Sequence, residues 1–164
     1  VWMLRILMME LQRVVKPGGS CLMFTDWRML IHLVPPLEST GWAYQNLIVW
    51  NKRHPGMGHG FRAQHELIMH FAHGSPNFYS KSAGNVLTVP RVPSSKRYHP
   101  TEKPTELMQR LLEVVSKPGD VVLDPFGGSG PTAEACEKTG RKFIVIDKVP
   151  GFLMATKDRL QKSK

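Results

Sequence analysis

The sequence predicts an α/β fold with a mainly parallel sheet, and two observations lead to this class. Short apolar runs of strand length alternate with segments of helical periodicity, the order typical of helices packed on a parallel sheet. A glycine-rich turn also joins one apolar strand directly to a helix, at residues 121–138. The chain has 164 residues, of which 41% are hydrophobic, so one domain with a real core is expected.

The first half is predicted to contain two helices and three strands, at residues 4–15, 20–25, 28–39, 44–51 and 66–72. Apolar residues recur at helical spacing from Leu4 to Val15, and Pro17-Gly18-Gly19 end that helix. Pro35-Pro36 are expected to break the second helix, since proline lacks the N–H of the helical ladder. The last two strands are rich in branched and aromatic residues.

The second half is predicted to alternate helix and strand, at residues 106–116 (helix), 121–123 (strand), 131–138 (helix), 142–146 (strand) and 150–161 (helix). Glycine, proline and basic residues dominate 52–64 and 74–99, which are both expected to be loops.

The strongest local signal is the loop Asp124-Pro125-Phe126-Gly127-Gly128-Ser129-Gly130, which lies between a strand and a helix. Glycine allows a sharp turn and a close approach to a ligand. The following helix offers unpaired N–H groups and a partial positive charge. Asp147 ends the next strand, where an acid can accept the hydroxyl protons of a ribose. The loop is therefore predicted to bind a nucleotide-like cofactor.

Two other interpretations of this loop were weighed. It could be a tight turn without a ligand, although three glycines and a well-placed acid are hard to explain by packing. Gly128-Ser129-Gly130-Pro131-Thr132-Ala133 also fits the dinucleotide pattern G-x-G-x-x-A. That pattern usually opens its fold, whereas here only about one strand and one helix follow, and it gives no role to Asp124-Pro125-Phe126.

The loop at 124–130 resembles the D-P-F-x-G-S-G cofactor loop of DNA amino-methyltransferases, and His99-Pro100-Thr101-Glu102-Lys103-Pro104 resembles their H-P-T-x-K-P segment. Asp147 and Pro150 are similar to the acid and proline of the next motif. The resemblance implies S-adenosylmethionine as the cofactor, in a Rossmann-like methyltransferase fold. The residues it assigns to the cofactor are Thr101, Lys103, Pro104, Asp124, Phe126, Gly127, Gly128, Ser129, Gly130, Thr132 and Asp147.

The first half carries the same resemblance. Lys16-Pro17-Gly18-Gly19 resembles the family's K-P-G-G turn, Gly41-Trp42 with 48–52 resembles its G-[FW]…I-V-W-x-K strand, and 61–66 resembles F-R-x-x-H-E. This order is that of the permuted β class. It implies one methyltransferase domain, 1–164, with a catalytic half (1–73), a short recognition loop (74–98) and a cofactor-binding half (99–164).

The implied activity is site-specific transfer of a methyl group to the exocyclic amine of adenine or cytosine in DNA, as in restriction-modification. The family's loop usually has Thr-Thr after its last glycine; here Pro131 removes one N–H, which a helix tolerates in its first turn. The family's D-P-P-[YFW] tetrapeptide, which holds the target amine and stacks on the flipped base, does not occur in these residues.

Val34-Pro35-Pro36-Leu37 is no substitute for that tetrapeptide, because it lacks both the polar residue and the aromatic. No catalytic residue is therefore assigned, and the tetrapeptide is expected to lie before Val1. The chain is expected to be a fragment, a remnant or one piece of a split protein, with little or no activity alone. In the family, the strand that carries this tetrapeptide lies between the cofactor strand and the strand 20–25, so the sheet of this chain is expected to be incomplete. A homodimer or a partner could supply that strand. The alternative is a catalytically inactive, prophage-like remnant that still binds DNA or cofactor.

Basic side chains gather in the two predicted loops. Between Lys52 and Lys103 the sequence has eight Lys or Arg but only Glu66 and Glu102 as acids, and the whole chain carries a net charge of +9. Such an excess favours double-stranded DNA as the partner, through contacts with phosphates. The residues expected to contact DNA are Lys52, Arg53, Arg62, Lys81, Arg91, Lys96 and Arg97. Methylation of RNA or protein is the third hypothesis, against which the two family motifs argue.

Other site types are not expected. His65-Glu66-Leu67-Ile68-Met69-His70 is one residue too long for the H-E-x-x-H zinc motif, and on a strand its two histidines point to opposite faces. Cys21 and Cys136 both lie in apolar or helical runs and are expected to be buried free thiols. No membrane span or leader is visible, so a cytoplasmic location is expected.

Overall fold

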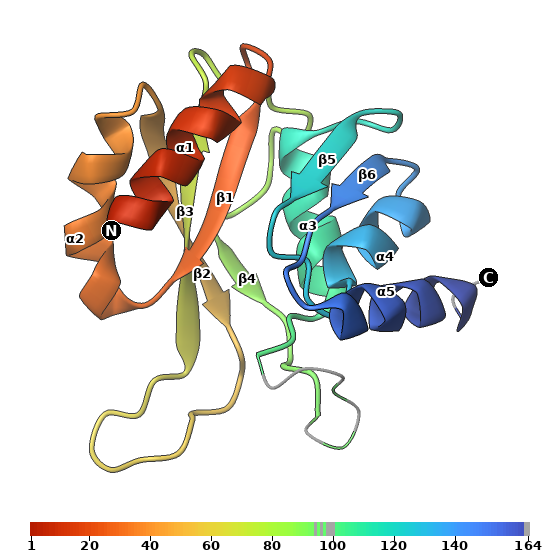
Figure 1. Ribbon diagram of the computed structural model, residues 1–164. Helices are drawn as coiled ribbons and strands as arrows, with labels where there is room; N and C mark the ends of the chain where they lie inside the picture. Colours follow the sequence, from red (N-terminus) through yellow and green to blue (C-terminus); the bar gives the residue numbers. More distant parts are fainter. Residues whose placement is uncertain (94, 96, 98–100, 163–164) are drawn as a thin grey trace. The chain divides into compact units, whose positions relative to one another are not determined.

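The elements follow one another in the order α1-β1-α2-β2-β3-β4-α3-β5-α4-β6-α5 (Figure 1). The structure is a computed structural model that describes residues 1–93, 95, 97 and 101–162. The predicted residues Lys96, His99 and Pro100 lie outside the described part. The chain forms two compact units, the first made of Val1–Phe78 and Ser82–Thr88, the second of Tyr79–Lys81 and Val89–Lys164. The single domain expected from the sequence stays a prediction.

The first unit contains a four-stranded sheet in the order β1-β3-β2-β4. Its strands are β1 (Ser20–Thr25), β2 (Ala43–Asn51), β3 (His65–Ala72) and β4 (Val86–Thr88). β3 runs antiparallel to both β1 and β2, while β4 runs parallel to β2. The central position of β3 explains why its last six residues are all buried.

The α/β class is confirmed, but the prediction of a mainly parallel sheet is only partly right. β2 and β3 are joined directly by the loop 52–64, and a chain that reverses through a loop pairs antiparallel. β4 lies inside the stretch 74–99 that was predicted to be only loop. A strand of three residues is too short to show the sequence periodicity that predicts a strand. Its partner in the sheet, β2, also lies more than thirty residues earlier.

Two helices, α1 (Trp2–Val14) and α2 (Trp27–Glu38), belong to the same unit and pack against each other (Figure 1). Asp26 caps α2, because its Oδ1 accepts the backbone N–H groups of Arg28 and Met29 at 2.8 and 3.0 Å. The core joins both helices to β3; its buried members are Met8, Leu33, Leu37, Trp42, Met69 and Phe71.

The expected break at Pro35-Pro36 is wrong, because α2 continues through both prolines to Glu38. Each proline removes one backbone donor from the ladder. The neighbouring leucines compensate, since Leu33 and Leu37 are 3% and 0% exposed and belong to the core. The prolines also lie in the last turns, where the carbonyl of Pro35 accepts the N–H of Ser39 at 3.1 Å.

The second unit contains α3 (Thr105–Val115), β5 (Val121–Asp124), α4 (Pro131–Lys138), β6 (Lys142–Val145) and α5 (Pro150–Lys162). β5 and β6 pair in parallel, as the sequence predicted for strands joined by a helix. α4 contacts α3, α5 and β6, so it is the central helix of this unit.

Within the described residues, β1 pairs only with β3 and β5 pairs only with β6, so each strand lies at the edge of its sheet. None of the helices in this part of the chain is both long and apolar enough to cross a membrane.

His70 is a buried titratable group in the middle of β3. It is 3% exposed, and its Nε2 lies 2.9 Å from Oγ of Ser20 on β1. Burial disfavours the charged imidazolium and lowers the pKa of His70 below its ordinary value of 6.5. The unfolded chain therefore binds this proton more readily than the folded unit, so stability is lost as the pH falls below 6.5.

The substitution His70→Gln should make the stability of the chain less sensitive to acid. The amide can still bond Ser20 but does not titrate between pH 7.5 and pH 5.5. Between pH 7.5 and pH 5.5, the free energy of unfolding in urea should fall more for the wild type than for the variant. His65→Gln is the matched control, since His65 lies on the same strand with an exposed side chain. Equal pH dependence in wild type and His70→Gln would contradict this explanation.

Candidate functional site

The predicted cofactor loop, residues 124–130, connects β5 to the start of α4. Two backbone hydrogen bonds fix it against Ile146, the residue after β6: Gly127 N donates to Ile146 O at 3.0 Å, and Ile146 N donates to Asp124 O at 2.9 Å. A third closes the loop on itself, since Gly130 N donates to Gly127 O at 2.9 Å. The conformation of the loop is therefore fixed by hydrogen bonds within the chain.

Each of the three glycines in this loop is required at its position for a different structural reason. A Cβ at Gly127 would lie 2.1 Å from Cγ1 of Val145, and a Cβ at Gly130 would lie 2.6 Å from the side chain of Thr156. Gly130 also has φ +82, which L-residues rarely adopt. Gly128 also has a positive φ, +52, but it differs in its surroundings, because no heavy atom lies within 4 Å of the position a Cβ would take. The open space beside this loop is therefore at Gly128.

Asp124 holds the loop from its first residue. Its Oδ1 accepts the backbone N–H of Phe126 at 3.0 Å, and its Oδ2 accepts the hydroxyl of Thr132 at 2.5 Å. Thr132 is 4% exposed, whereas the ring of Phe126 is 61% exposed. Of these three predicted residues, Phe126 has an exposed side chain, whereas the side chains of the other two bond each other.

Asp147 lies two residues after the end of β6, close to its predicted place at the strand end, and reaches the glycine loop. Its Oδ2 accepts the N–H of Gly128 at 2.9 Å, and its Oδ1 accepts the N–H of Val149 at 2.9 Å. The residue is only half-buried. A carboxylate has about four acceptor sites, so each oxygen can accept a further hydrogen bond.

The segment before α3 supplies the other predicted residues. Thr101 is exposed, Lys103 is half-buried, and Pro104 is buried at the N-cap of α3. Between them lies Glu102, whose side chain is 3% exposed. Its Oε2 accepts the hydroxyl of Ser129 at 2.9 Å, which joins this segment to the cofactor loop. The structure thus brings the two sequence motifs together through a residue that the sequence analysis did not select.

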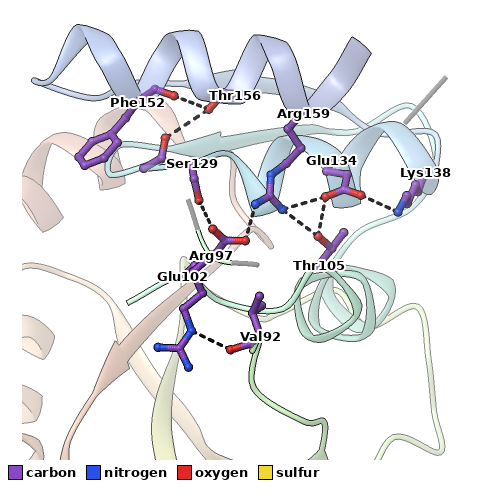
Figure 2. Close-up of polar contacts among 11 residues, drawn as sticks. Val92, Arg97, Glu102, Thr105, Ser129, Glu134, Lys138, Phe152, Thr156 and Arg159 are labelled. Atoms are coloured by element: carbon purple, nitrogen blue, oxygen red, sulfur yellow. Dashed lines mark hydrogen bonds and ion pairs between the residues drawn. The ribbon is translucent and has the colours of Figure 1, made fainter. Parts of the chain in front are cut away.

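Figure 2 shows a network of buried charges around Glu102. Arg159 of α5 donates from Nη2 to Oε1 of Glu102 and from Nη1 to Oε2 of Glu134 on α4, the latter at 3.0 Å. Thr105 and Lys138 also donate to Glu134, at 2.7 and 2.6 Å. Burial alone would raise the pKa of Glu134, but the hydrogen bonds from Lys138, Thr105 and Arg159 outweigh it and lower the pKa to about 2. Glu134 is therefore ionised at neutral pH.

The sequence analysis missed Glu102, Glu134, Thr156 and Arg159. Glu102 occupies the variable position of H-P-T-x-K-P, and a buried acid there needs a partner that sequence spacing does not reveal. That partner, Arg159, lies 57 residues later. A positive side chain on a final helix is typically read as part of a solvated face.

The residues of the first unit that are predicted to contact DNA differ in how exposed their charged groups are. Arg53 and Arg62 are exposed on the loop between β2 and β3, which extends beyond the strands (Figure 1). Lys52 is half-buried, and its Nζ lies 2.6 Å from Oε1 of Glu66 and 5.1 Å from the ring centroid of Trp50. The charge of Lys52 is therefore already paired within the chain. Met57 and Phe61, on the same loop, are fully exposed.

The predicted DNA contacts in the second unit are Lys81, Arg91 and Arg97. Lys81 and Arg91 are exposed. Arg97 is half-buried, and its Nε donates to the carbonyl of Val92 at 2.7 Å (Figure 2). Lys96 lies outside the described residues.

Val34-Pro35-Pro36-Leu37 lies inside α2, and Leu37 is fully buried in the core, so this segment does not form a catalytic loop. Burial raises the pKa of Cys21 to about 12 and that of Cys136 to about 11, and in Cys136 this effect outweighs the opposing charge of Arg141. Both thiols therefore stay protonated and poorly nucleophilic at neutral pH. In the part of the chain that the structure describes, no three His, Cys, Asp or Glu side chains gather to hold a metal.

Comparison with known proteins agrees with this geometry. The family model described as "DNA methylase" matches residues 2–158. The Escherichia coli (strain K12) protein named "Putative methylase YubD" is 30% identical over 151 residues, which cover 92% of this chain and 66% of that protein. The type II methyltransferase M2.LlaDCHI of Lactococcus lactis subsp. cremoris is 28% identical and is matched over 91% of this chain and 62% of its own length. This chain therefore spans about two thirds of the length of the curated relatives it matches.

Among solved structures, the complex of M1.HpyAVI with S-adenosylmethionine is similar with a TM-score of 0.86 and 25% identity, over 97% of this chain and 82% of that chain. The cytosine-N4-specific PvuII DNA methyltransferase, at 18% identity and a TM-score of 0.79, covers 96% of this chain and 69% of its own and supports the fold alone. The Rossmann-like fold is thus confirmed. Because the family model spans nearly the whole chain, this chain belongs to the DNA methylase family.

Proposed function

We propose that the chain binds S-adenosylmethionine at the loop 124–130 and acts in methylation of an exocyclic amine of adenine or cytosine in DNA. The observation that carries this proposal is the open space at Gly128 beside the half-buried carboxylate of Asp147. The space lies at the N-terminus of α4, where helix dipole and backbone N–H groups favour polar ligands. Similarity to a methyltransferase solved with S-adenosylmethionine supports the same cofactor.

The predicted cofactor residues divide into two groups under this proposal. Those proposed to face the ligand are Phe126, Gly128 and Asp147, together with Thr101 and Lys103 of the preceding segment. Those that hold the site are buried or engaged within the fold: Pro104, Asp124, Gly127, Ser129, Gly130 and Thr132. Asp147 would accept the ribose hydroxyls while it also fixes the N–H of Gly128.

When bound, S-adenosylmethionine supplies an electrophilic methyl group that a DNA amine can attack directly. The chain's own cysteines take no part, because both thiols are protonated by burial. The absence of a D-P-P-[YFW] tetrapeptide from the 164 residues supports the further proposal that these residues alone transfer methyl groups weakly or not at all. A segment or partner that brings this tetrapeptide could pair with the edge strands β1 or β5. The alternative function, an inactive module that binds cofactor or DNA, rests on the same missing tetrapeptide.

The loop between β2 and β3 is the part of the first unit that we propose to contact duplex DNA. Arg53 and Arg62 can bind phosphates, and Arg53 has φ +67, an uncommon conformation for a residue other than glycine. Met57 and Phe61 expose apolar side chains between them. Apolar side chains on basic DNA-binding loops can wedge between base steps.

The first prediction from this proposal is cofactor binding without efficient turnover. Calorimetry with S-adenosylmethionine should give saturable binding, which Asp147→Asn should weaken about 10- to 100-fold, the loss expected when a charged acceptor becomes neutral. Asp158→Asn, an exposed acid on α5, is the control and should bind as the wild type does. NADH should not bind. Incorporation of radiolabelled methyl groups into mixed-sequence duplex DNA should be absent or slight.

No heat at millimolar S-adenosylmethionine would refute the cofactor proposal. Robust methyl transfer by the 164 residues alone would refute the proposal of weak activity, without affecting the proposed cofactor.

The second prediction concerns the β2–β3 loop. Arg53→Ala combined with Arg62→Ala should weaken binding to duplex DNA and reduce the slope of log affinity against log salt by about 1 to 2, because each lost phosphate contact changes it by roughly 0.9. Phe61→Ala should weaken binding with no change in that slope. Arg13→Ala, an exposed arginine of α1 paired with Glu10, is the control. Unchanged affinity and slope in the double variant would exclude this loop from the DNA interface.

A further inference from the structure

Two buried polar side chains of α5 lie three residues apart and therefore on the same face of the helix. Thr156 is 5% exposed, and the side chain of Arg159 is 10% exposed. Figure 2 shows both pointing from α5 toward the glycine loop and the start of α4. The remainder of α5 is largely half-buried or exposed, so this face is its main polar link to the site.

Thr156 contacts the loop directly. Its single hydroxyl proton is shared between the carbonyl oxygen of Gly128 in the loop, at 3.2 Å, and that of Phe152 in α5, at 3.0 Å. The side chain also fills the space beside Gly130, where a Cβ would lie 2.6 Å from both Cγ2 and Oγ1 of Thr156. One side chain thus meets the two glycines whose positive φ values shape the loop.

Arg159 reaches the loop through Glu102. One guanidinium nitrogen, Nη2, donates to Oε1 of Glu102, and Oε2 of Glu102 accepts the hydroxyl of Ser129. Ser129 is 2% exposed, so its side chain bonds inside the protein. Movement of Arg159 would therefore be transmitted to Ser129 through a buried carboxylate.

The second guanidinium nitrogen, Nη1, ties the loop to the helix that follows it. It donates to Glu134 of α4, which also accepts from Lys138 and Thr105. Glu102, Glu134 and Arg159 are the buried charges of this network, and the exposed ammonium of Lys138 supplies the second positive charge. Buried charges are tolerated only when they are paired and hydrogen-bonded in this way.

We propose that Thr156 and Arg159 are positioning residues for S-adenosylmethionine, which act through Gly128 and Ser129 to keep the glycine loop in its ligand-receiving conformation. This inference rests on the proposed function, because it assigns a purpose to the same loop. A loop that is ordered before binding avoids the entropic cost of ordering during binding. The rival explanation is that both residues only stabilise the fold.

Two substitutions at Thr156 separate these explanations. Thr156→Val keeps the volume beside Gly130 but removes the hydroxyl, whereas Thr156→Ser keeps the hydroxyl but removes the methyl group. Both variants should lose some thermal stability. Only Thr156→Val should bind S-adenosylmethionine more weakly in calorimetry, by about 3- to 10-fold, the value of one hydrogen bond. Thr156→Ser should bind within about twofold of the wild type.

Arg159→Lys tests the second contact, since a single ammonium cannot reproduce the fork that joins Glu102 to Glu134. Arg159→Lys should also weaken binding of S-adenosylmethionine. If Arg159→Lys folds poorly, Ser129→Ala takes its place, because it removes only the hydrogen bond to Glu102, and it should weaken binding as well. Arg110→Lys is the control, because Arg110 forms an exposed pair with Glu106 on α3. Amide hydrogen exchange of the ligand-free chain should be faster at Gly128–Gly130 in Thr156→Val and in Arg159→Lys, but not in Arg110→Lys.

Wild-type affinity and wild-type exchange in Thr156→Val and Arg159→Lys would overturn the positioning role. If Thr156→Ser bound S-adenosylmethionine as weakly as Thr156→Val, affinity would simply follow thermal stability. That result would also overturn the positioning role. If the wild type binds no S-adenosylmethionine, the proposed function itself fails, and the exchange data then report only a structural role.

Discussion

The buried pairing of Arg159 with Glu102 and Glu134 is the interaction on which the second unit depends. It joins three separate stretches of the chain: the segment before α3, the glycine loop with the helix α4 that follows it, and α5. A pair of this kind adds little net stability compared with apolar packing, but removal of one partner leaves an unpaired buried charge that costs about 3–5 kcal/mol. The network therefore selects one arrangement of these elements rather than simply strengthening the unit.

Most carboxylates in this site accept hydrogen bonds from other groups of the same chain. Asp124 binds Phe126 and Thr132, and Glu102 binds Ser129 and Arg159. Asp147 differs because it is half-buried and bonds two backbone N–H groups while retaining acceptor capacity. The carboxylate proposed to recognise the ribose therefore also sets the position of Gly128. Precise placement of a ligand group by residues that are themselves fixed is a general requirement of such sites.

Local sequence signals predicted most of the fold, since nearly every helix and strand lies within a few residues of its expected position. The errors have physical causes. Pro35-Pro36 do not break α2 because Leu33 and Leu37 hold it in the core, and β4 is too short to show periodicity. In the site, the glycines and Asp147 were predictable because they follow strand ends. Arg159 and Thr156 were not, because their roles depend on how α5 packs, which spacing along the chain does not specify.

The central claim is that a preformed glycine loop in the second unit binds S-adenosylmethionine. The most direct measurement is titration of the isotopically labelled chain with S-adenosylmethionine, followed through the backbone amide NMR signals. Saturable shifts are expected at Gly127–Gly130 and at Asp147 to Val149, with the strands of the first unit unchanged. Signals of 127–130 should already be sharp and dispersed before ligand is added, since the loop is hydrogen-bonded without it. Shifts confined to the first unit, or no shifts at saturating ligand, would contradict the account.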